Sequence, residues 1–230
     1  MIEYGHGTHA GLRRTDNEDT YYADAGSGLF LIADGIGGYR QGALAAALAR
    51  DAVVEGIGRG EDLFAAVQAA HRHLLELAKA RDVLPLGATL AALRITDGHY
   101  QAAWVGDSRL YRWRQGLDRI VHDAHYAAER CPAQGTEPER PPQRRNAATQ
   151  ALGMPRREPL QIGLARGDAT PGSGFLLCSD GLVDALDEAA LARIMGRTEL
   201  AAQECVDHLL LDALAGDAAD NLSAIVLRIS

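Results

Sequence analysis

The chain has 230 residues, 47% of them hydrophobic, and a formal net charge of −8 at pH 7. Its length and apolar content suffice for one substantial core, so we expect a single domain over residues 1–230. The acidic balance argues against a nucleic-acid partner, and the chain has neither a long apolar run nor a secretory pattern, which predicts a cytoplasmic protein without membrane contact.

Apolar and amphipathic segments predict five strands and four helices. In chain order we expect a strand at 29–33, helices at 42–57 and 61–80, strands at 89–95, 100–105 and 175–178, helices at 188–195 and 199–214, and a strand at 221–229. Because the helices come in pairs between blocks of strands, this order favours an α+β layered domain over a doubly wound parallel sheet.

Residues 131–145 differ from the rest of the chain, since they are polar, contain four prolines and show no apolar period. This composition predicts an exposed loop or flap. A disordered surface insertion is an equally good interpretation of the same composition.

Four aspartates stand beside the ends of predicted strands. Asp34, Asp107 and Asp180 each follow a strand, and Asp220 directly precedes the last one. Any one of them would be explained as a turn former. If the strands share a core, however, four carboxylates can meet at one place, where their mutual repulsion calls for cations. Oxygen ligands favour Mn²⁺ or Mg²⁺ over zinc, and the carbonyl of Gly35 is a further candidate ligand.

Arginine and acidic residues also gather near the start of the chain, at positions 13–19. A solvated turn with local ion pairs would explain this cluster. The functional interpretation is that one arginine of this cluster binds two phosphate oxygens while Glu18 and Asp19 hold water bound to the metal.

Six motifs of the chain resemble, in the same order, those of the metal-dependent protein phosphatases of the protein phosphatase 2C type. They are Arg14-x-x-Asn17-Glu18-Asp19, Asp34-Gly35-Ile36-Gly37-Gly38, Gly87-Ala88-Thr89, Val105-Gly106-Asp107-Ser108-Arg109, Ser179-Asp180-Gly181 and Asp220-Asn221. One such motif is weak support, but six in family order over nearly the whole chain are specific.

The resemblance implies a central β-sandwich of two antiparallel sheets flanked by pairs of helices. It also implies a serine/threonine phosphatase in which a hydroxide bridging two Mn²⁺ or Mg²⁺ ions attacks the phosphate. The implied metal ligands are Asp34, the Gly35 carbonyl, Asp180 and Asp220, and the implied catalytic residues are Arg14, Asp34 and Asp180.

The remaining site residues implied by the resemblance are more peripheral. Glu18 and Asp19 would contact the ions through water, Arg14 would orient the phosphate, and Asp107, with Asp184, would form a third ion position. The implied partners are phosphoserine and phosphothreonine proteins modified by a cognate bacterial kinase, and we expect a monomer.

The chain departs from the family pattern in two places. Ile36 stands where eukaryotic members carry a histidine proposed as general acid, so the acid for the leaving group is open, with a metal-bound water as first candidate. The flap, at about 122–147, is shortened and rich in proline, and it begins with His122-Asp123-Ala124-His125 in place of the usual aspartate-histidine-serine stretch. Because this flap helps to select substrates in the family, substrate specificity is the least transferable part of what the resemblance implies.

Other functions fit less well. An aspartyl-phosphate phosphatase needs a second acid two residues after Asp34, where Ile36 stands, and residues 35–42 lack the Walker lysine of a nucleotide loop. A catalytically inactive phosphoprotein-binding module would be expected to have lost metal acids. His71 and His73 lie two apart on a predicted helix, so we expect solvent-exposed roles for them, and Cys178 is expected in the core.

Overall fold

The computed structural model describes residues 1–36, 40–81, 86–121, 150–155 and 160–230. The strands are β1 (Ile2–His9), β2 (Asp19–Asp24), β3 (Leu29–Ile36), β4 (Gly87–Ala88), β5 (Leu90–Thr96), β6 (His99–Val105), β7 (Arg109–Trp113), β8 (Leu117–Arg119), β9 (Gly163–Asp168), β10 (Gly174–Cys178) and β11 (Leu222–Ile229). The helices are α1 (Arg40–Gly58), α2 (Leu63–Arg81), α4 (Asp180–Ala185), α5 (Glu188–Met195) and α6 (Ala202–Ala215).

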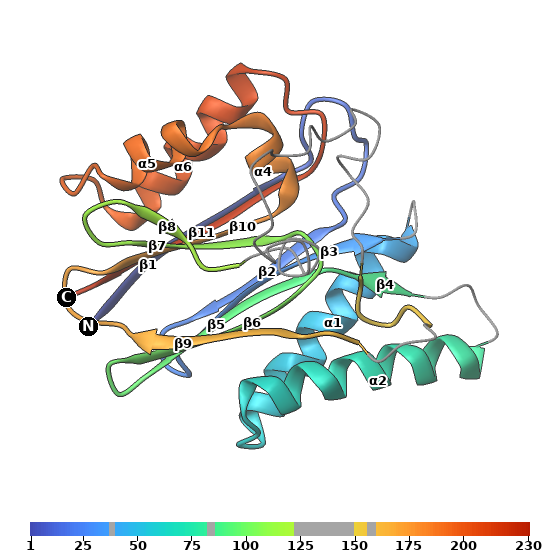
Figure 1. The fold of residues 1–230 in the computed structure, drawn as a ribbon. Coiled ribbons are helices and arrows are strands. Elements are labelled where there is room, and N and C mark those ends of the chain that lie inside the picture. Colours follow the sequence, from blue (N-terminus) through green and yellow to red (C-terminus); the bar gives the residue numbers. More distant parts are fainter. Residues whose placement is uncertain (37–39, 82–85, 122–149, 156–159) are drawn as a thin grey trace, which may run out of the picture.

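Two antiparallel sheets stack on each other, and helices cover the outer face of each (Figure 1). One sheet has the order β1-β11-β10-β7-β8 and lies under α4, α5 and α6. The other has the order β2-β3-β5-β6-β9, with β4 paired to β3, and packs on α1 and α2. The predicted α+β sandwich with flanking helices is confirmed.

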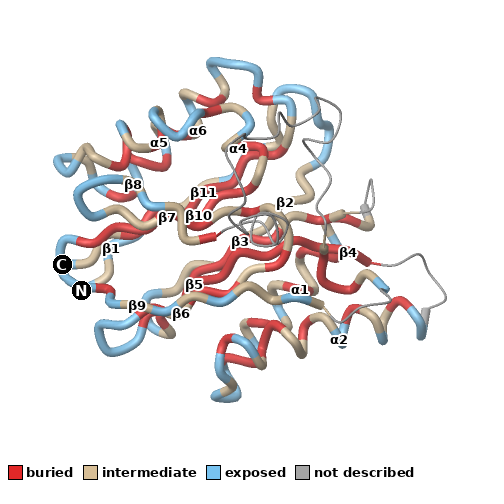
Figure 2. The backbone as a smooth tube through the Cα atoms, in the orientation of Figure 1, coloured by how far each residue is buried: buried red, intermediate tan, exposed pale blue. Residues whose placement is uncertain are grey.

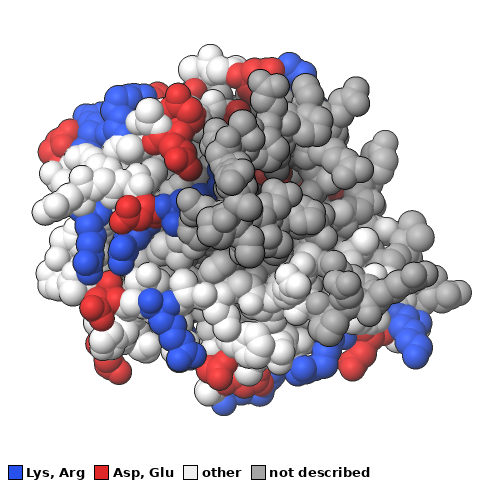
Figure 3. All heavy atoms as spheres, in the orientation of Figure 1, with Lys and Arg blue, Asp and Glu red and all other residues white. Residues whose placement is uncertain are grey.

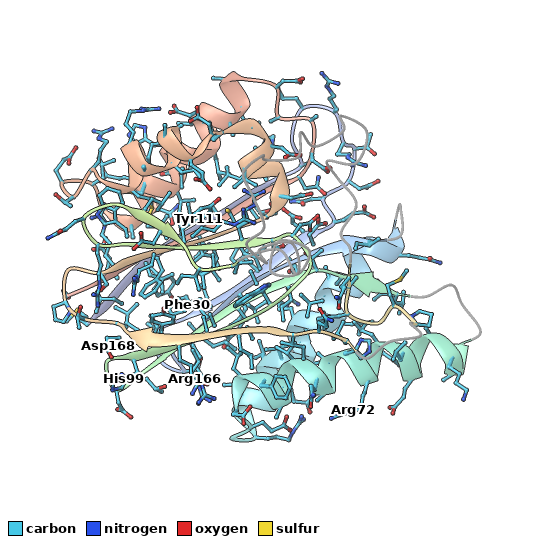
Figure 4. All side chains as sticks on the ribbon, viewed as in Figure 1. Phe30, Arg72, His99, Tyr111, Arg166 and Asp168 are labelled. Atoms are coloured by element: carbon cyan, nitrogen blue, oxygen red, sulfur yellow. The ribbon has the colours of Figure 1, made fainter. Side chains whose placement is uncertain are left out.

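The inner strands are buried on both faces, as the red core of Figure 2 shows. In β3, Leu29, Leu31 and Ala33 pack toward α1 and α2, whereas Phe30 and Ile32 pack between the sheets. Phe30 is labelled in that position in Figure 4. Because both faces are covered, such strands consist of continuous apolar residues, and this is why the sequence revealed them.

The five predicted strands and four predicted helices all exist, with ends shifted by a few residues. Helix α2 starts at Leu63 rather than at residue 61, because the Asp62 side chain accepts the Ala65 N–H at 2.8 Å and caps the helix. Helix α6 starts at Ala202 rather than at residue 199, where Glu204 reaches back to the N–H of Ala201 at 2.8 Å.

Sequence patterns did not predict β1, β2, β4, β7, β8, β9 or α4. Strands β1, β2, β8 and β9 lie at sheet edges and bury too little for an apolar run. Strand β9 contains two glycines covered by aromatic rings of β6, since a Cβ on Gly163 would lie 2.0 Å from the Trp104 indole and one on Gly167 would lie 2.7 Å from the Tyr100 ring. Glycine under an aromatic ring is a strand device that propensity scales miss.

The predicted flap at about 122–147 lies outside the described residues, as do His122, His125 and Cys131. Among the helices that the structure describes, none is both long and apolar enough to cross a bilayer. Charges of both signs are mixed over the described surface seen in Figure 3.

Candidate metal centre

Both sheets contribute acids to one end of the sandwich. Asp19 opens β2 and is the register partner of Asp34 on β3. Asp107 follows β6, Asp180 is the first residue of α4 directly after β10, and Asp220 precedes β11. The prediction that Asp34 follows its strand was wrong: β3 continues to Ile36, because Gly35 and Ile36 pair with β4.

The acids lie close enough to perturb one another. Burial, followed by the charges of Asp19, Asp180, Asp107 and Asp220, raises the pKa of Asp34 to about 9. Burial, together with the charges of Asp107, Asp220, Asp184 and Asp19, raises the pKa of Asp180 to about 7. Carboxylates that raise one another's pKa in a buried place form a site for cations.

Hydroxyl groups hold Asp19 in place. Ser223 donates its hydroxyl to Asp19 Oδ2 at 2.7 Å, and the Ser223 N–H donates to Ser179 Oγ at 3.0 Å. Burial raises the pKa of Asp19, although its side-chain hydrogen bonds with Ser223 and Ser179 oppose the change. The other oxygen, Oδ1, is buried and has no hydrogen-bond partner among the described residues, so it is free to accept a ligand or water.

Glycines allow the backbone of α1 to approach both Glu18 and β3. A Cβ on Gly42 would lie 2.4 Å from Glu18 Oε1 and 2.9 Å from the Gly35 carbonyl oxygen, so both oxygens face the same spot on α1. Glu18 Oε1 is buried without a hydrogen-bond partner among the described residues, and burial raises the pKa of Glu18. The two oxygens belong to a group of oxygen donors that suits a hard divalent cation.

Arg14 lies at the rim of the acidic cluster. Its Nη2 donates to Asp220 Oδ2 at 2.8 Å, and this hydrogen bond, with the Asp220 charge, raises the pKa of the guanidinium. The Arg14 side chain is 54% exposed, so it remains accessible to a ligand. A half-exposed guanidinium beside a carboxylate cluster can bind a phosphate oxygen.

Asn221 is a functional residue for which sequence reasoning assigned no role. Its Oδ1 accepts the Glu18 N–H at 2.8 Å, while Nδ2 donates to the carbonyls of Ala10 at 2.9 Å and Asp16 at 3.0 Å. The side-chain amide therefore fixes the loop that carries Arg14. The signal in the sequence was only its position next to Asp220.

A second pair missed by sequence reasoning supports Asp34. The Thr89 N–H donates to the Asp34 carbonyl at 2.8 Å, and the Thr89 hydroxyl lies 2.8 Å from the Ser108 hydroxyl. Both hydroxyls are buried, and Ser108 follows Asp107. This contact connects the backbone beside Asp34 to the turn that carries Asp107.

The acidic side chains lie near one another, but they are not arranged to coordinate an ion. Among the residues that the structure describes, no three Asp, Glu, His or Cys side chains could hold one ion as they stand. Asp220 Oδ2 is engaged by Arg14, and Asp19 Oδ2 is engaged by Ser223. Arg14 and Ser223 thus compete with an ion for these two oxygens. The predicted ligand roles of Asp34, Gly35, Asp180 and Asp220 stay predictions, as does a third ion at Asp107 and Asp184.

Cys178 is excluded as a catalytic nucleophile. Cys178 is fully buried, and burial raises the pKa of its thiol to about 12, so it stays protonated in the core as predicted. A buried thiol of this kind does not act as a nucleophile.

Comparisons with known proteins agree with the geometry. The matching family is described as Protein phosphatase 2C, and the match covers residues 6–215. The serine/threonine protein phosphatase PstP of Mycobacterium tuberculosis is 30% identical over 237 residues, which cover 98% of this chain and 45% of PstP. The chain therefore spans less than half the length of that relative.

Two solved structures are similar over nearly all of this chain. PppA, described as a key regulatory component of T6SS in Pseudomonas aeruginosa, is 29% identical with a TM-score of 0.80, covering 99% of this chain and 97% of its own. The catalytic domain of PstP in complex with two manganese ions is 26% identical with a TM-score of 0.83, covering 100% of this chain and 99% of its own.

Proposed function

The chain belongs to the protein phosphatase 2C family, and from this premise we propose that it is a metal-dependent serine/threonine protein phosphatase. The observation that carries the proposal is the meeting of Asp19, Asp34, Asp180 and Asp220 from both sheets, at a place where burial raises the pKa values of Asp34 and Asp180. Such a cluster is poorly stable unless cations neutralise it.

The donor set fits the metal. Asp34, the Gly35 carbonyl, Asp180 and Asp220 would hold two divalent ions, and the free oxygens of Glu18 and Asp19 would accept hydrogen bonds from water bound to these ions. Bound divalent ions supply a water of lowered pKa and neutralise charge on the phosphoryl oxygens. Oxygen-only donors suit Mn²⁺, which the PstP structure contains, and equally Mg²⁺.

The protein groups then have defined tasks. Arg14 binds a phosphoryl oxygen from the rim, and the Asn221 amide keeps the Arg14 loop in register with Asp220. Ile36 has no proton to give, so the proton for the leaving-group oxygen would come from another donor, with a metal-bound water as the first candidate. No side-chain nucleophile is needed in this scheme.

The substrates we propose are phosphoserine and phosphothreonine proteins of a cognate kinase, and the protein would act as a cytoplasmic monomer. PppA is described as a regulatory component of a secretion system, which supports a regulatory phosphatase as the general class. A third ion at Asp107 and Asp184 is part of the same proposal.

The test is hydrolysis of a phosphothreonine peptide and of para-nitrophenyl phosphate with Mn²⁺, with Mg²⁺ and after chelation. We expect turnover that requires the ion and returns when Mn²⁺ is restored. Binding of the phosphopeptide without turnover would instead identify a binding module, and full activity after chelation would refute the metal centre.

A further inference from the structure

His71 makes a specific contact that the acidic centre does not explain. It lies on α2 beside Arg72, which Figure 4 labels, and its Nδ1 accepts the Gly153 backbone N–H at 3.0 Å. The expectation of a solvent-exposed role holds for His73, which is exposed, but not for His71, which is half-buried. Because Nδ1 accepts a hydrogen bond, the neutral ring carries its proton on Nε2.

Gly153 belongs to a short segment that is tightly held. Its φ is +75°, and a Cβ there would lie 2.0 Å from the Leu86 carbonyl oxygen and 2.7 Å from Leu74. The preceding Leu152 is fully buried and forms an antiparallel bridge with Ala88, with N–H to carbonyl distances of 2.8 and 3.2 Å. The segment 150–155 is thus seated between α2 and β4.

Strand β4 connects segment 150–155 to the backbone of β3 in the acidic centre. Ala88 is the register partner of Gly35, and the following Thr89 donates its N–H to the Asp34 carbonyl at 2.8 Å. A continuous series of backbone contacts therefore leads from His71 to the two adjacent residues of β3 that we assign to metal binding. Packed elements joined in this way can transmit a change in position.

The same segment also touches the turn that carries Asp107. A Cβ on Gly106 would lie 3.2 Å from the Gln150 carbonyl oxygen, and the φ of Gly106 is +95°. One short segment is therefore linked to both acid-bearing elements: directly to the Asp107 turn, and through β4 to the Asp34 strand.

We propose that His71 is a positioning residue of the metal centre: its Nδ1 holds segment 150–155 against β4, and β4 fixes the backbone of Asp34 and Gly35. The inference rests on the proposed function, because it assigns metal binding to those two residues. It adds a residue outside every motif of the family resemblance.

Three variants test whether the hydrogen-bond acceptor at position 71, rather than the imidazole ring as a whole, is required. In His71→Asn the amide oxygen can occupy the place of Nδ1, whereas His71→Leu removes the acceptor and leaves the Gly153 N–H unpaired. His73→Leu, an exposed histidine on the same helix, is the matched control. Should His71→Leu fail to fold, His71→Gln replaces it, because its amide oxygen reaches toward the Nε2 position instead.

The readouts are Mn²⁺ affinity of the full chain by calorimetry, amide hydrogen exchange across residues 150–155, and thermal stability without metal. We expect His71→Leu to weaken Mn²⁺ binding by about 2- to 30-fold and to speed exchange at Gly153. The Mn²⁺ affinity of His71→Asn and of His73→Leu should stay within about 2-fold of the wild type. His71→Asn keeps an acceptor for the Gly153 N–H, and His73→Leu leaves that hydrogen bond unchanged.

Unchanged Mn²⁺ affinity in His71→Leu would overturn the proposal, even if its thermal stability fell, because the contact would then be merely structural. Equal losses in His71→Asn and His71→Leu would also overturn it, since the acceptor would not be the cause. None of these readouts depends on turnover. An inactive wild type would therefore refute the proposed function, whereas the Mn²⁺ affinities of the variants would still test the role of His71.

Discussion

Replacing Asp34 by asparagine should change the stability of the chain in opposite directions with and without divalent ions. Without metal, Asp34 is a buried acid surrounded by other acids, and its pKa of about 9 means that folding at pH 8 makes it bind a proton. Asparagine has the same shape and needs no proton. The metal-free variant should therefore be more stable than the wild type.

The magnitude follows from the pKa. One pKa unit corresponds to about 1.4 kcal/mol, so the gap between pH 8 and the ordinary value of 3.8 sets a ceiling of about 6 kcal/mol. Asparagine still buries a polar group, which costs about 1–3 kcal/mol if it is poorly paired and leaves about 3–5 kcal/mol of that ceiling. Because Asp34 keeps some exposure to solvent, screening lowers the gain further, and we expect about 2 kcal/mol. With Mn²⁺ at 100 times its Kd the wild type gains about 2.7 kcal/mol, which the variant loses.

The stability of the metal-free wild type should fall as pH rises. For an acid whose folded pKa is raised, the stability it contributes is fully present below the ordinary value of 3.8 and is lost as pH rises through the folded value of about 9. Asp180 adds a loss between 3.8 and about 7. The metal-free wild type should thus weaken from pH 5 to pH 8, and the advantage of Asp34→Asn should grow over that range.

The assay is urea unfolding of both proteins at pH 5 and pH 8, with chelator and with Mn²⁺. Asp118→Asn, an aspartate whose side chain is 65% exposed, is the control and should change stability by at most about 0.5 kcal/mol. A metal-free Asp34→Asn that is clearly less stable than the wild type at pH 8 would refute the idea of a repulsive cluster awaiting cations.

Three further variants test other parts of the account. Arg14→Ala should lower kcat/KM for a phosphopeptide about 100-fold and weaken inhibition by inorganic phosphate in parallel, because the rim guanidinium is lost; an unchanged phosphate inhibition constant would speak against its role. Thr89→Val should cost about 1–2 kcal/mol in urea unfolding through its lost hydroxyl contacts, whereas Thr89→Ser, which keeps the hydroxyl, should cost less. Gly163→Ala should cost about 1–3 kcal/mol and shift tryptophan fluorescence, since its Cβ meets Trp104, while Gly116→Ala, with open space around it, should not.

The sequence predicted the interior of the fold better than its edges. Strands buried on both faces, such as β10 with five buried residues, have apolar runs that single-sequence patterns detect. Edge strands such as β1 and β9 mix glycine with polar residues, because only part of their surface is covered. Their pairing depends on partners distant in sequence, for example Gly7 with Ala224, and no local pattern encodes that.

The acids of the site were also predictable, since Asp107, Asp180 and Asp220 stand beside strand ends where chains converge. The residues that hold them in place were not. Asn221 and Thr89 act through hydrogen bonds to backbone groups far away in the chain, and His71 acts through Gly153, which follows it by 82 positions. Such contacts depend on the finished packing rather than on composition or spacing.

The most direct test of the metal centre is anomalous diffraction at the manganese edge from crystals grown with Mn²⁺. The account predicts two strong peaks among the carboxylates of Asp34, Asp180 and Asp220, with one ion against the Gly35 carbonyl. Crystals in which these side chains stay apart with no anomalous peak between them, from a preparation that hydrolyses phosphopeptide, would contradict it.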